Sequence, residues 1–600
     1  MRIQVKPIAL MAFALAAVGC ADLALEPDRV PHSMVLVPAD TLITQGDPAR
    51  LRVTVLDVDG NVIPGPPLWA PPEWEISEPD AVQIAPDGTI TGLRGTSTRV
   101  IAKVAGLQAW TTLRINPTSV SLSAPAVYLT QAAQNIDGTV PILAGRPALL
   151  RVFATGDEVS FYEPRVRATF YNDDEVVHSA TINPGSEVLP EDVVEGRLDR
   201  SYNALIPGEV LQPGVGLVVE LDADGVVPKD PGTGSRVPAE GIMPLNVVDM
   251  PNLHQIIVPV LLTWAPDERV FNWTRGMTAD SRHLQLARTL LPIGPMTVEV
   301  HETFHTSADL TTQGGWNRFI REIRAMYFME GERGYYYGAL QLPSGSAWGG
   351  LGYLGYPHVS VGRATEGTYA HELGHNMDLR HAPCGGAGGP DPNYPYDGGS
   401  SGIWGYNLER GRLVDPGQYK DLMGYCRPDW VSDYHFIRAA EHRLATEPAP
   451  AAGAGPAEKT LLLWGGASGG ELEVEPAFVI DAPASLPTKP GPYRLEGFGP
   501  DGRHHFSFDF SPDPVEHGGA HFMFAVPYDP DRDGALERVV LRGPQGEFTL
   551  RAGSTAPMAI ITSRATGQVR AILRDWNGGF NRVAGDIEIM VSDGLPGGVR

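Results

Sequence analysis

The stretch TYAHELGHNMDLRH at residues 368–381 constrains the fold more than any other part of the chain. It contains His371, Glu372 and His375, and His381 follows six residues later. Successive residues of an α-helix advance by about 100°, so His371 and His375 lie within about 40° of one another on one face. Two imidazoles on one helix face can bind a single metal ion. The stretch therefore predicts a helix and then a sharp turn that returns His381 to the same ion.

The three histidines and the glutamate predict a catalytic metal centre. Three neutral imidazoles leave the fourth position of a tetrahedral zinc ion for water, as in catalytic rather than structural zinc sites. Glu372 stands beside the metal face of the helix, where a carboxylate can take a proton from water as that water attacks a carbonyl. We therefore expect His371, His375 and His381 to be zinc ligands and Glu372 to be the general base.

This pattern resembles the metzincin clan of zinc endopeptidases, in which H-E-x-x-H-x-x-G-x-x-H is followed by a Met-turn. Both histidine spacings match, and Asp421-Leu422-Met423-Gly424-Tyr425 resembles the Met-turn. The resemblance spans about residues 251–447. It implies that Met423 underlies the metal and that Tyr425 stabilises the transition state. A packed core tyrosine is the alternative for Tyr425.

Two further observations refine the resemblance. The run APCGGAGGPDPNYPYDGGSSGIWGYN after His381 is most similar to secreted bacterial metzincins related to mucin-cleaving enzymes. The glycine of the clan's motif, which permits a left-handed turn, is replaced by Asp378. Since aspartate adopts left-handed backbone angles more readily than most residues, we expect the turn to survive.

The rest of the chain predicts mainly short strands. Glycine (69) and proline (54) make up about a fifth of the 600 residues, without a Gly-X-Y period. Together with the resemblance, this predicts a multidomain chain in which an α+β metzincin-type catalytic domain is flanked by all-β sandwich-like domains. The expected segments are a lipoprotein signal peptide (1–20), a tether (21–32), a bacterial Ig-like sandwich (33–116), a sandwich-like domain (117–250), the peptidase domain (251–446), a linker (447–458) and a C-terminal sandwich (459–600).

The first 20 residues predict export. Arg2 and Lys6 precede an apolar run that is too short to span a bilayer. The run ends in Ala-Val-Gly-Cys20, which resembles a bacterial lipobox and implies lipidation of Cys20. A plain secretory signal is the alternative. We expect a protein anchored by lipid in the cell envelope or on the cell surface, with no membrane-spanning helix.

The two remaining cysteines form an even pair in an oxidising compartment. Cys384 lies three residues after His381, and Cys426 lies three after Met423. A disulfide between them would tie the loop of the third ligand to the Met-turn. Two free thiols are the alternative.

Charge restricts the partners. Lys and Arg number 46 against 71 Asp and Glu, which gives a formal net charge of −25. Nucleic acid is excluded as a partner, because phosphate binding needs clustered basic residues. We expect a monomer that acts on a protein or glycoprotein substrate.

Several other histidines and acids are candidate metal ligands. His301-Glu302-x-x-His305, with Glu322 downstream, has the spacing of a zinc motif, but its Thr-rich alternating context predicts a strand. His435 and His442 follow the Met-turn, where packing or solvated roles are expected. Two acidic segments carry oxygen ligands suited to a weak calcium site: Asp529, Asp531 and Asp533; and Asp391, Asn393 and Asp397.

These observations predict an exported zinc endopeptidase that hydrolyses extracellular proteins or glycoproteins. The alternative is a cell-surface binding or adhesion lipoprotein whose zincin domain is catalytically idle. The intact Glu372 favours the enzyme, because a scaffold has no need of a general base there.

Overall fold

The computed structural model describes residues 30–65, 69–229, 235–447, 456–468, 470–580, 582–583 and 585–596. The expected signal peptide and Cys20 lie outside the described residues, as does most of the expected linker. The chain divides into two compact units, Met1–Val120 with Glu158–Tyr162, and Ser121–Asp157 with Glu163–Arg600. In the described part of the chain, no helix combines the length and the apolar character needed to cross a membrane.

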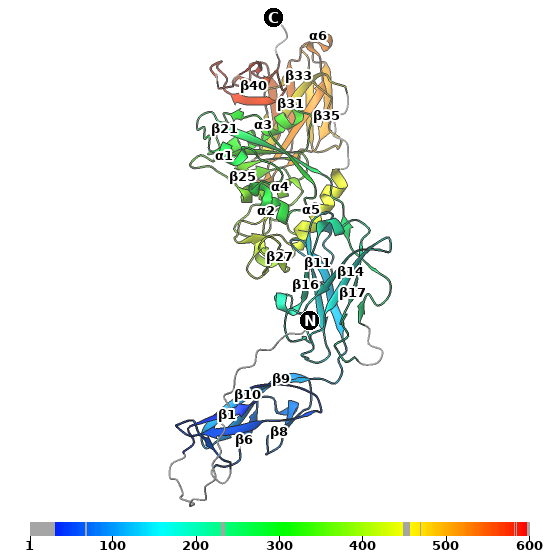
Figure 1. Cartoon of the computed structure of the whole chain (residues 1–600). Coiled ribbons are helices and arrows are strands. Elements are labelled where there is room, and N and C mark those ends of the chain that lie inside the picture. Colours follow the sequence, from blue (N-terminus) through cyan, green and yellow to red (C-terminus); the bar gives the residue numbers. More distant parts are fainter. Residues whose placement is uncertain are drawn as a thin grey trace, which may run out of the picture. The chain divides into compact units, whose positions relative to one another are not determined.

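The first unit consists of short strands, drawn in blue in Figure 1. Its sheets have the orders β1-β4-β5, β2-β10-β9-β6 and β3-β8-β7 around a shared apolar core. Alternation of buried and exposed residues along β9 fits a strand with one face in that core. The strands are β1 (Ser33–Val37), β2 (Asp40–Thr44), β3 (Pro48–Arg50), β4 (Arg52–Leu56), β5 (Val62–Ile63), β6 (Glu73–Ile76), β7 (Val82–Ile84), β8 (Thr89–Gly92), β9 (Thr96–Val104) and β10 (Leu107–Asn116).

The second unit begins with further β structure, in the orders β11-β13-β16, β12-β20 and β15-β14-β17-β18 with β19 beside β17. Its strands fall in the segment expected to be sandwich-like. They are β11 (Ser123–Thr130), β12 (Ile142–Leu143), β13 (Ala148–Thr155), β14 (Val166–Asn172), β15 (Glu175–Ile182), β16 (Tyr202–Ile206), β17 (Gly216–Glu220), β18 (Arg236–Val237), β19 (Met243–Pro244) and β20 (Val247–Val248).

A nine-stranded sheet carries the candidate site, in the order β25-β26-β24-β21-β23-β41-β40-β42 with β22 beside β21. Its central strands run parallel, whereas β25 at one edge is antiparallel to β26. The central strand β21 is buried on both faces, as expected for a parallel strand covered by helices. The strands are β21 (Leu253–Leu262), β22 (Met296–Val300), β23 (Phe304–Thr306), β24 (Tyr335–Leu340), β25 (Gly350–Gly352), β26 (Val359–Arg363), β40 (Met558–Ser563), β41 (Val569–Arg574) and β42 (Ile587–Ser592).

Helices cover both faces of this sheet. One apolar core joins one face to α2, α4 and α5, and a second joins the other face to α3. Beyond α4 lie two pairs of short strands, β27 with β28 and β29 with β30, and the second pair flanks the expected Met-turn. The elements are α1 (Val270–Thr274), α2 (Arg282–Leu290), α3 (Gln313–Met329), α4 (Glu366–Asn376), β27 (Gly405–Asn407), β28 (Arg412–Val414), β29 (Lys420–Asp421), β30 (Asp429–Trp430) and α5 (Asp433–Thr446).

The C-terminal strands divide between two structures. Two sheets, β32-β31-β37-β36 with β33 and β35-β34-β38-β39, enclose a common apolar core and form a sandwich. The elements are β31 (Glu458–Ser468), β32 (Glu471–Val474), β33 (Phe478–Ala482), β34 (Tyr493–Phe498), β35 (His504–Phe510), β36 (Asp513–Pro514), β37 (Ala520–Pro527), α6 (Pro530–Asp533), β38 (Arg538–Gly543) and β39 (Gly546–Arg551).

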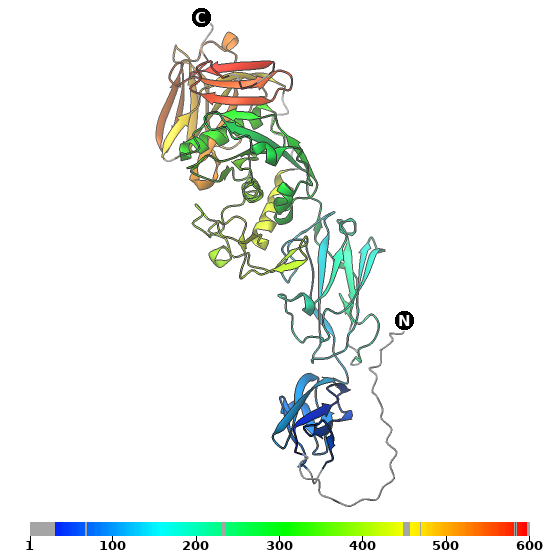
Figure 2. The same cartoon turned by 60° about the vertical axis from the view of Figure 1, so that its left-hand side comes forward.

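The remaining C-terminal strands differ from the expected separate domain at 459–600. β41 pairs in parallel with β23, so β40–β42 extend the sheet of the peptidase region. The outward face of the sandwich, including Leu462 and Trp464, packs in the same core as α3. Both views show the orange and red strands against the green sheet (Figures 1 and 2). The peptidase region and the C-terminal strands therefore bury apolar surface against each other, and this burial holds the two segments together.

Buried charges cross the same junction. Arg321 on α3 lies 2.5 Å from Glu475, which follows β32, and Arg574 on β41 lies 2.5 Å from the other oxygen of that carboxylate. Arg574 also lies 3.0 Å from Glu322 on α3. Removing one partner from such a buried group is costly, because the other charges are left uncompensated.

Candidate metal centre

Helix α4 and the turn after it bring the three predicted histidines together. Ring centroids of His371 and His375 lie 4.8 Å apart, and His381 lies 4.8 Å from His375 and 5.3 Å from His371. One nitrogen of each ring and a carboxylate oxygen of Glu516 all lie within 4.8 Å of one another. The three imidazoles therefore lie close enough together to bind one metal ion, as the spacing of the histidines predicts.

Each histidine is oriented by its other ring nitrogen. Nδ1 of His371 lies 2.9 Å from the Leu422 carbonyl, Nδ1 of His375 lies 2.7 Å from that of Leu379, and Nδ1 of His381 lies 2.6 Å from that of Gly388. A carbonyl oxygen only accepts, so Nδ1 carries the proton and donates in all three bonds. Each neutral ring thus directs its Nε2 lone pair to the centre, as metal-binding histidines do.

These nitrogen atoms fit a metal ion. Nε2 of His371 and Nε2 of His375 are buried and have no hydrogen-bond partner. Burial, followed by the proximity of His375, lowers the pKa of His371 to about 3, so this ring is neutral at physiological pH. Neutral imidazoles are the form that binds zinc. The donor set of three imidazoles therefore fits zinc.

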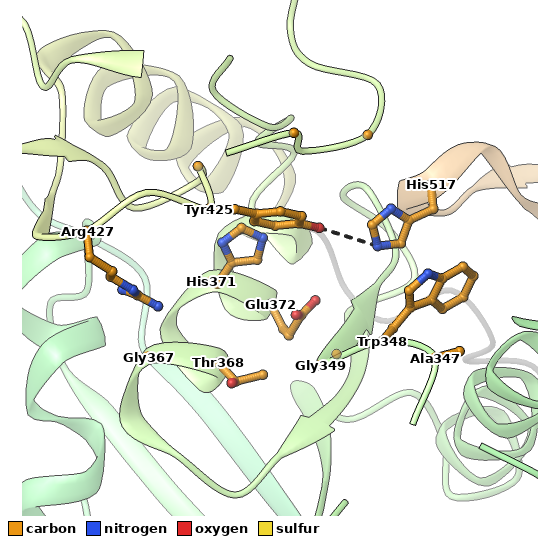
Figure 3. Close-up of a pocket in the computed structure, with 14 residues that line it drawn as sticks. Ala347, Trp348, Gly349, Gly367, Thr368, His371, Glu372, Tyr425, Arg427 and His517 are labelled. Atoms are coloured by element: carbon orange, nitrogen blue, oxygen red, sulfur yellow. Dashed lines mark hydrogen bonds between the residues drawn. The ribbon is translucent and has the colours of Figure 1, made fainter. Parts of the chain in front are cut away.

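Glu372 lies beside the histidines at the floor of the pocket (Figure 3). Burial raises the pKa of its carboxyl well above the ordinary value, and the carboxylate of Glu516 raises it further. Strand β25 passes very close, since a Cβ on Gly350 would overlap Oε1 of Glu372. Glycine at this position thus permits the strand and the carboxylate to share one wall of the pocket.

The turn after α4 is left-handed, as expected. Asp378 has φ of 63°, and its amide donates to the His375 carbonyl at 2.9 Å. The amide of Leu379 donates to the carbonyl of Gly374 at 3.1 Å and closes the end of the helix. Aspartate thus occupies a conformation that costs a non-glycine residue about 1–2 kcal/mol, and the chain returns His381 to the centre.

The predicted Met-turn lies beneath helix α4. Met423 is fully buried, and a Cβ on Gly374 would come 2.5 Å from its sulfur. The turn also holds the ligands, because the Leu422 carbonyl accepts from His371 and the Met423 carbonyl accepts from the Ala382 amide at 3.1 Å. The packing is therefore that expected of the turn below a metal site.

Asp421, whose role was not anticipated, anchors the Met-turn. Its fully buried carboxylate accepts from the amides of Met423 at 2.8 Å and Ser432 at 2.9 Å. It also lies 2.8 Å from Nδ1 of His435. His435 thus has the packing role that was one of its two expected roles, and α5 is fixed to the turn.

Cys384 and Cys426 are joined in a disulfide, with Cα atoms 5.7 Å apart. A backbone hydrogen bond links the same two segments, because the Tyr425 amide donates to the Cys384 carbonyl at 3.1 Å. The bridge ties the segment after His381 to the segment after Met423.

A pocket of about 560 Å³ opens over the centre. Tyr425 is 46% exposed at its rim, which differs from the packed-core alternative. The Tyr425 hydroxyl lies 3.3 Å from Nε2 of His381. It also lies 3.4 Å from Nε2 of His517, a contact marked by the dashed line in Figure 3. Trp348 stacks on His517 with centroids 4.7 Å apart. Arg427, Thr368 and several glycines complete the lining.

Glu516 is the main feature that sequence reasoning missed. It lies in the short turn Glu516–Gly518 between β36 and β37, and it is 5% exposed. Its Oε2 lies 2.7 Å from Nε2 of His375 and 3.2 Å from Nε2 of His381. No local motif marks Glu516, because the contact arises only from packing of distant strands.

The other candidate ligands lie elsewhere. His301 follows β22 and His305 lies in β23, as the strand-like context predicts, and His301 contacts Glu330 at 2.9 Å. The Asp529 side chain caps α6, and Asp391 accepts from Tyr434 at 2.9 Å. Among the described residues, the group able to hold a metal includes none of the acids considered for calcium, so calcium is unsupported.

Comparison with known proteins agrees with this centre. Residues 321–432 match the family model of peptidase M66. This range contains α4, the three histidines and the Met-turn, but not Glu516. The match supports a metallopeptidase, and the cluster of three histidines and one glutamate fits a zinc peptidase. No curated protein matches the chain.

Solved structures resemble parts of the chain only distantly. Domains 5–6 of the S-layer protein SbsC match at 12% identity, covering 37% of this chain and 98% of that one, with a TM-score of 0.13. The titin Ig tandem A164–A165 matches at 13% identity, covering 37% of this chain and 99% of that one, with a TM-score of 0.19. TM-scores this low carry no argument, so the Ig-like nature of residues 33–116 stays a prediction.

Proposed function

We propose that this chain is an exported zinc endopeptidase of the metzincin type that hydrolyses extracellular proteins or glycoproteins. The observation that carries the proposal is the convergence of three Nε2 lone pairs beside Glu372 in an open pocket. A zinc ion bound by His371, His375 and His381 would supply Lewis acidity, which lowers the pKa of water toward 7 and polarises a peptide carbonyl.

The proton transfers fall to Glu372. Its carboxylate lines the pocket beside His371, within reach of a water that attacks from the metal side. There it accepts the proton of the attacking water and then donates it to the leaving amine, as one carboxylate can do for both steps. Its enclosure by β25 keeps the carboxylate pointed into the pocket.

Tyr425 lines the same pocket as Glu372. Its hydroxyl is near His381, and the side chain is partly exposed. An O–H donor at this position can bind the carbonyl oxygen as negative charge develops on it. Burial raises the pKa of Tyr425, with further contributions from Glu516 and Glu372, so the phenol keeps its proton for donation.

Substrate binding is proposed at strand β25. This strand is the edge of the nine-stranded sheet, and Gly349 and Gly350 line the pocket. An edge strand can pair with an extended peptide through backbone hydrogen bonds. Such pairing would lay the scissile bond across Glu372. The substrate class, the lipid anchor at Cys20 and the location at the cell envelope belong to the proposal and rest on the sequence.

One observation favours the idle-site alternative, in which the protein binds partners without cleaving them. The carboxylate of Glu516 faces the same nitrogens that would hold zinc. Cleavage of casein and mixed glycoproteins by the zinc-loaded chain, compared with Glu372→Ala, separates the two functions. We expect the wild type to cleave and the variant to retain zinc but lose at least about 100-fold in rate. Equal rates for the two proteins would contradict the mechanism.

A further inference from the structure

The tip of the β36–β37 hairpin enters the metal centre from the C-terminal sandwich. Glu516 places Oε2 2.7 Å from Nε2 of His375 and 3.2 Å from Nε2 of His381. Oε2 has no hydrogen-bond partner, and Nε2 of His375 has none either. Oε2 of Glu516 therefore faces Nε2 of His375 and Nε2 of His381 directly.

This arrangement fits a metal cation. Nδ1 of His375 and Nδ1 of His381 both donate to backbone carbonyls, so each Nε2 of the neutral rings presents a lone pair. A carboxylate oxygen facing two lone pairs in a buried site is repelled unless a positive charge lies among them. A metal ion satisfies all of these atoms at once, and carboxylate oxygen is a zinc ligand in proteins, as imidazole nitrogen is.

The hairpin holds the carboxylate in place. Oε1 of Glu516 accepts from the amide of Gly352 at 3.2 Å, at the end of β25. Next to it, Val515 forms a bridge with Tyr353, and the Leu354 amide donates to the Pro514 carbonyl at 3.1 Å. Asp513 at the base of the hairpin contacts Arg324 at 2.5 Å. With one oxygen fixed to β25, the other is left for the metal.

We propose that Glu516 is a fourth protein ligand of the metal and that the resting chain is self-inhibited, because this carboxylate takes the position that the attacking water needs. The inhibition rests on the proposed peptidase function, whereas the ligation does not. The chain therefore carries its own inhibitory group on a hairpin of the C-terminal sandwich, and activity requires that Glu516 leave the metal.

Neighbouring contacts form a latch over the same position. His517, next to Glu516, stacks on Trp348 and approaches the Tyr425 hydroxyl, so the three side chains cross the pocket rim (Figure 3). Trp348, Tyr425 and His517 all line the pocket, so a peptide that entered it would compete with these contacts. Substrate binding would thus draw the hairpin tip away and open the fourth position in one movement.

Two variants of the full chain test the proposal. Glu516→Gln removes the charge but keeps an oxygen for the Gly352 amide, and Glu516→Asp keeps the charge but withdraws the carboxylate by one methylene. Glu471→Gln, at an exposed glutamate of β32, is the matched control. Each protein is reconstituted with Co²⁺, its visible absorption spectrum is recorded, and it is titrated with acetohydroxamate, a small chelator that needs an open metal position.

We expect both Glu516 variants to change the cobalt spectrum and to bind acetohydroxamate about tenfold or more tightly, since a closed state populated above 90% reduces apparent affinity by that factor. Glu516→Gln should bind zinc at least about tenfold more weakly than the wild type does. The control should match the wild type. An unchanged spectrum and unchanged acetohydroxamate affinity in both Glu516 variants would overturn the proposal.

Casein cleavage separates this proposal from the proposed function. If both hold, the Glu516 variants cleave casein faster than the wild type by about tenfold. If no variant cleaves any substrate while acetohydroxamate still binds more tightly, ligation by Glu516 stands and the peptidase function falls. If the wild type cleaves through Glu372 while the Glu516 variants gain neither rate nor chelator affinity, the peptidase stands and self-inhibition is refuted.

Discussion

The disulfide between Cys384 and Cys426 offers a perturbation whose size can be calculated. The two residues are 42 apart in sequence, so the bridge closes a loop of about 43 residues. In the chain-entropy model, a loop of that length restricts the unfolded chain by about 13 cal/mol/K, or about 4 kcal/mol at 25 °C. Replacing both cysteines by serine should lower the free energy of unfolding by up to this amount.

The native site should change much less. The Ala382 amide bonds to the Met423 carbonyl, and the Tyr425 amide bonds to the Cys384 carbonyl, whether or not the sulfurs are joined. The loop of His381 therefore keeps its attachment to the Met-turn in the folded state. We expect the double variant to bind zinc within about tenfold of the wild type while unfolding at lower urea concentration.

The assay is urea unfolding of the zinc-loaded protein, followed by circular dichroism, with a thiol titration of the unfolded, unreduced chain. The titration should find at most one free thiol, that of Cys20. Two or more free thiols would show that the bridge is absent. A double variant as stable as the wild type would refute the entropic argument.

Two other predictions concern the turn and the junction with the C-terminal strands. Asp378→Gly should keep zinc and activity and raise stability by up to about 1 kcal/mol, because φ of 63° suits glycine, whereas loss of both zinc and activity would contradict this reading. Burial alone would raise the pKa of Glu475, but Arg574 and Arg321 outweigh it and lower the pKa to about 2. Because the folded pKa is depressed, the stability from this carboxylate is present above about pH 4.5 and is lost as pH falls through about 2, a contribution of about 3 kcal/mol. The difference in free energy of unfolding between wild type and Glu475→Gln should therefore shrink between pH 5 and pH 2, and a difference independent of pH would count against the ion-pair network.

The sequence predicts the local part of the site because helix geometry fixes it. His371 and His375 share a face through their spacing alone, and Asp378 could be judged from the backbone angles that aspartate tolerates. Met423 follows from the resemblance and from its spacing from His381, and the Cys384–Cys426 pair follows from the position of each cysteine three residues after His381 or Met423. All of these residues lie within a short stretch around one helix and one turn.

Long-range packing accounts for what the sequence did not predict. Strand β41 pairs with β23 in the peptidase sheet. The Pro/Ala/Gly-rich segment before residue 459 predicts instead that the following residues form a separate domain. Glu516 reaches the metal centre only because the hairpin that carries it bridges to Tyr353. A single glutamate in a strand-rich segment has no periodicity or spacing that points to histidines on another element.

One zinc ion is expected to bind His371, His375 and His381. Elemental analysis of the full chain, purified without chelators and dialysed against buffer with trace zinc, tests it most directly beside the His375→Ala variant. We expect about one zinc per wild-type chain and less than a tenth of that in the variant under the same dialysis. A wild-type chain that holds no zinc, or a variant that holds as much as the wild type, would contradict it.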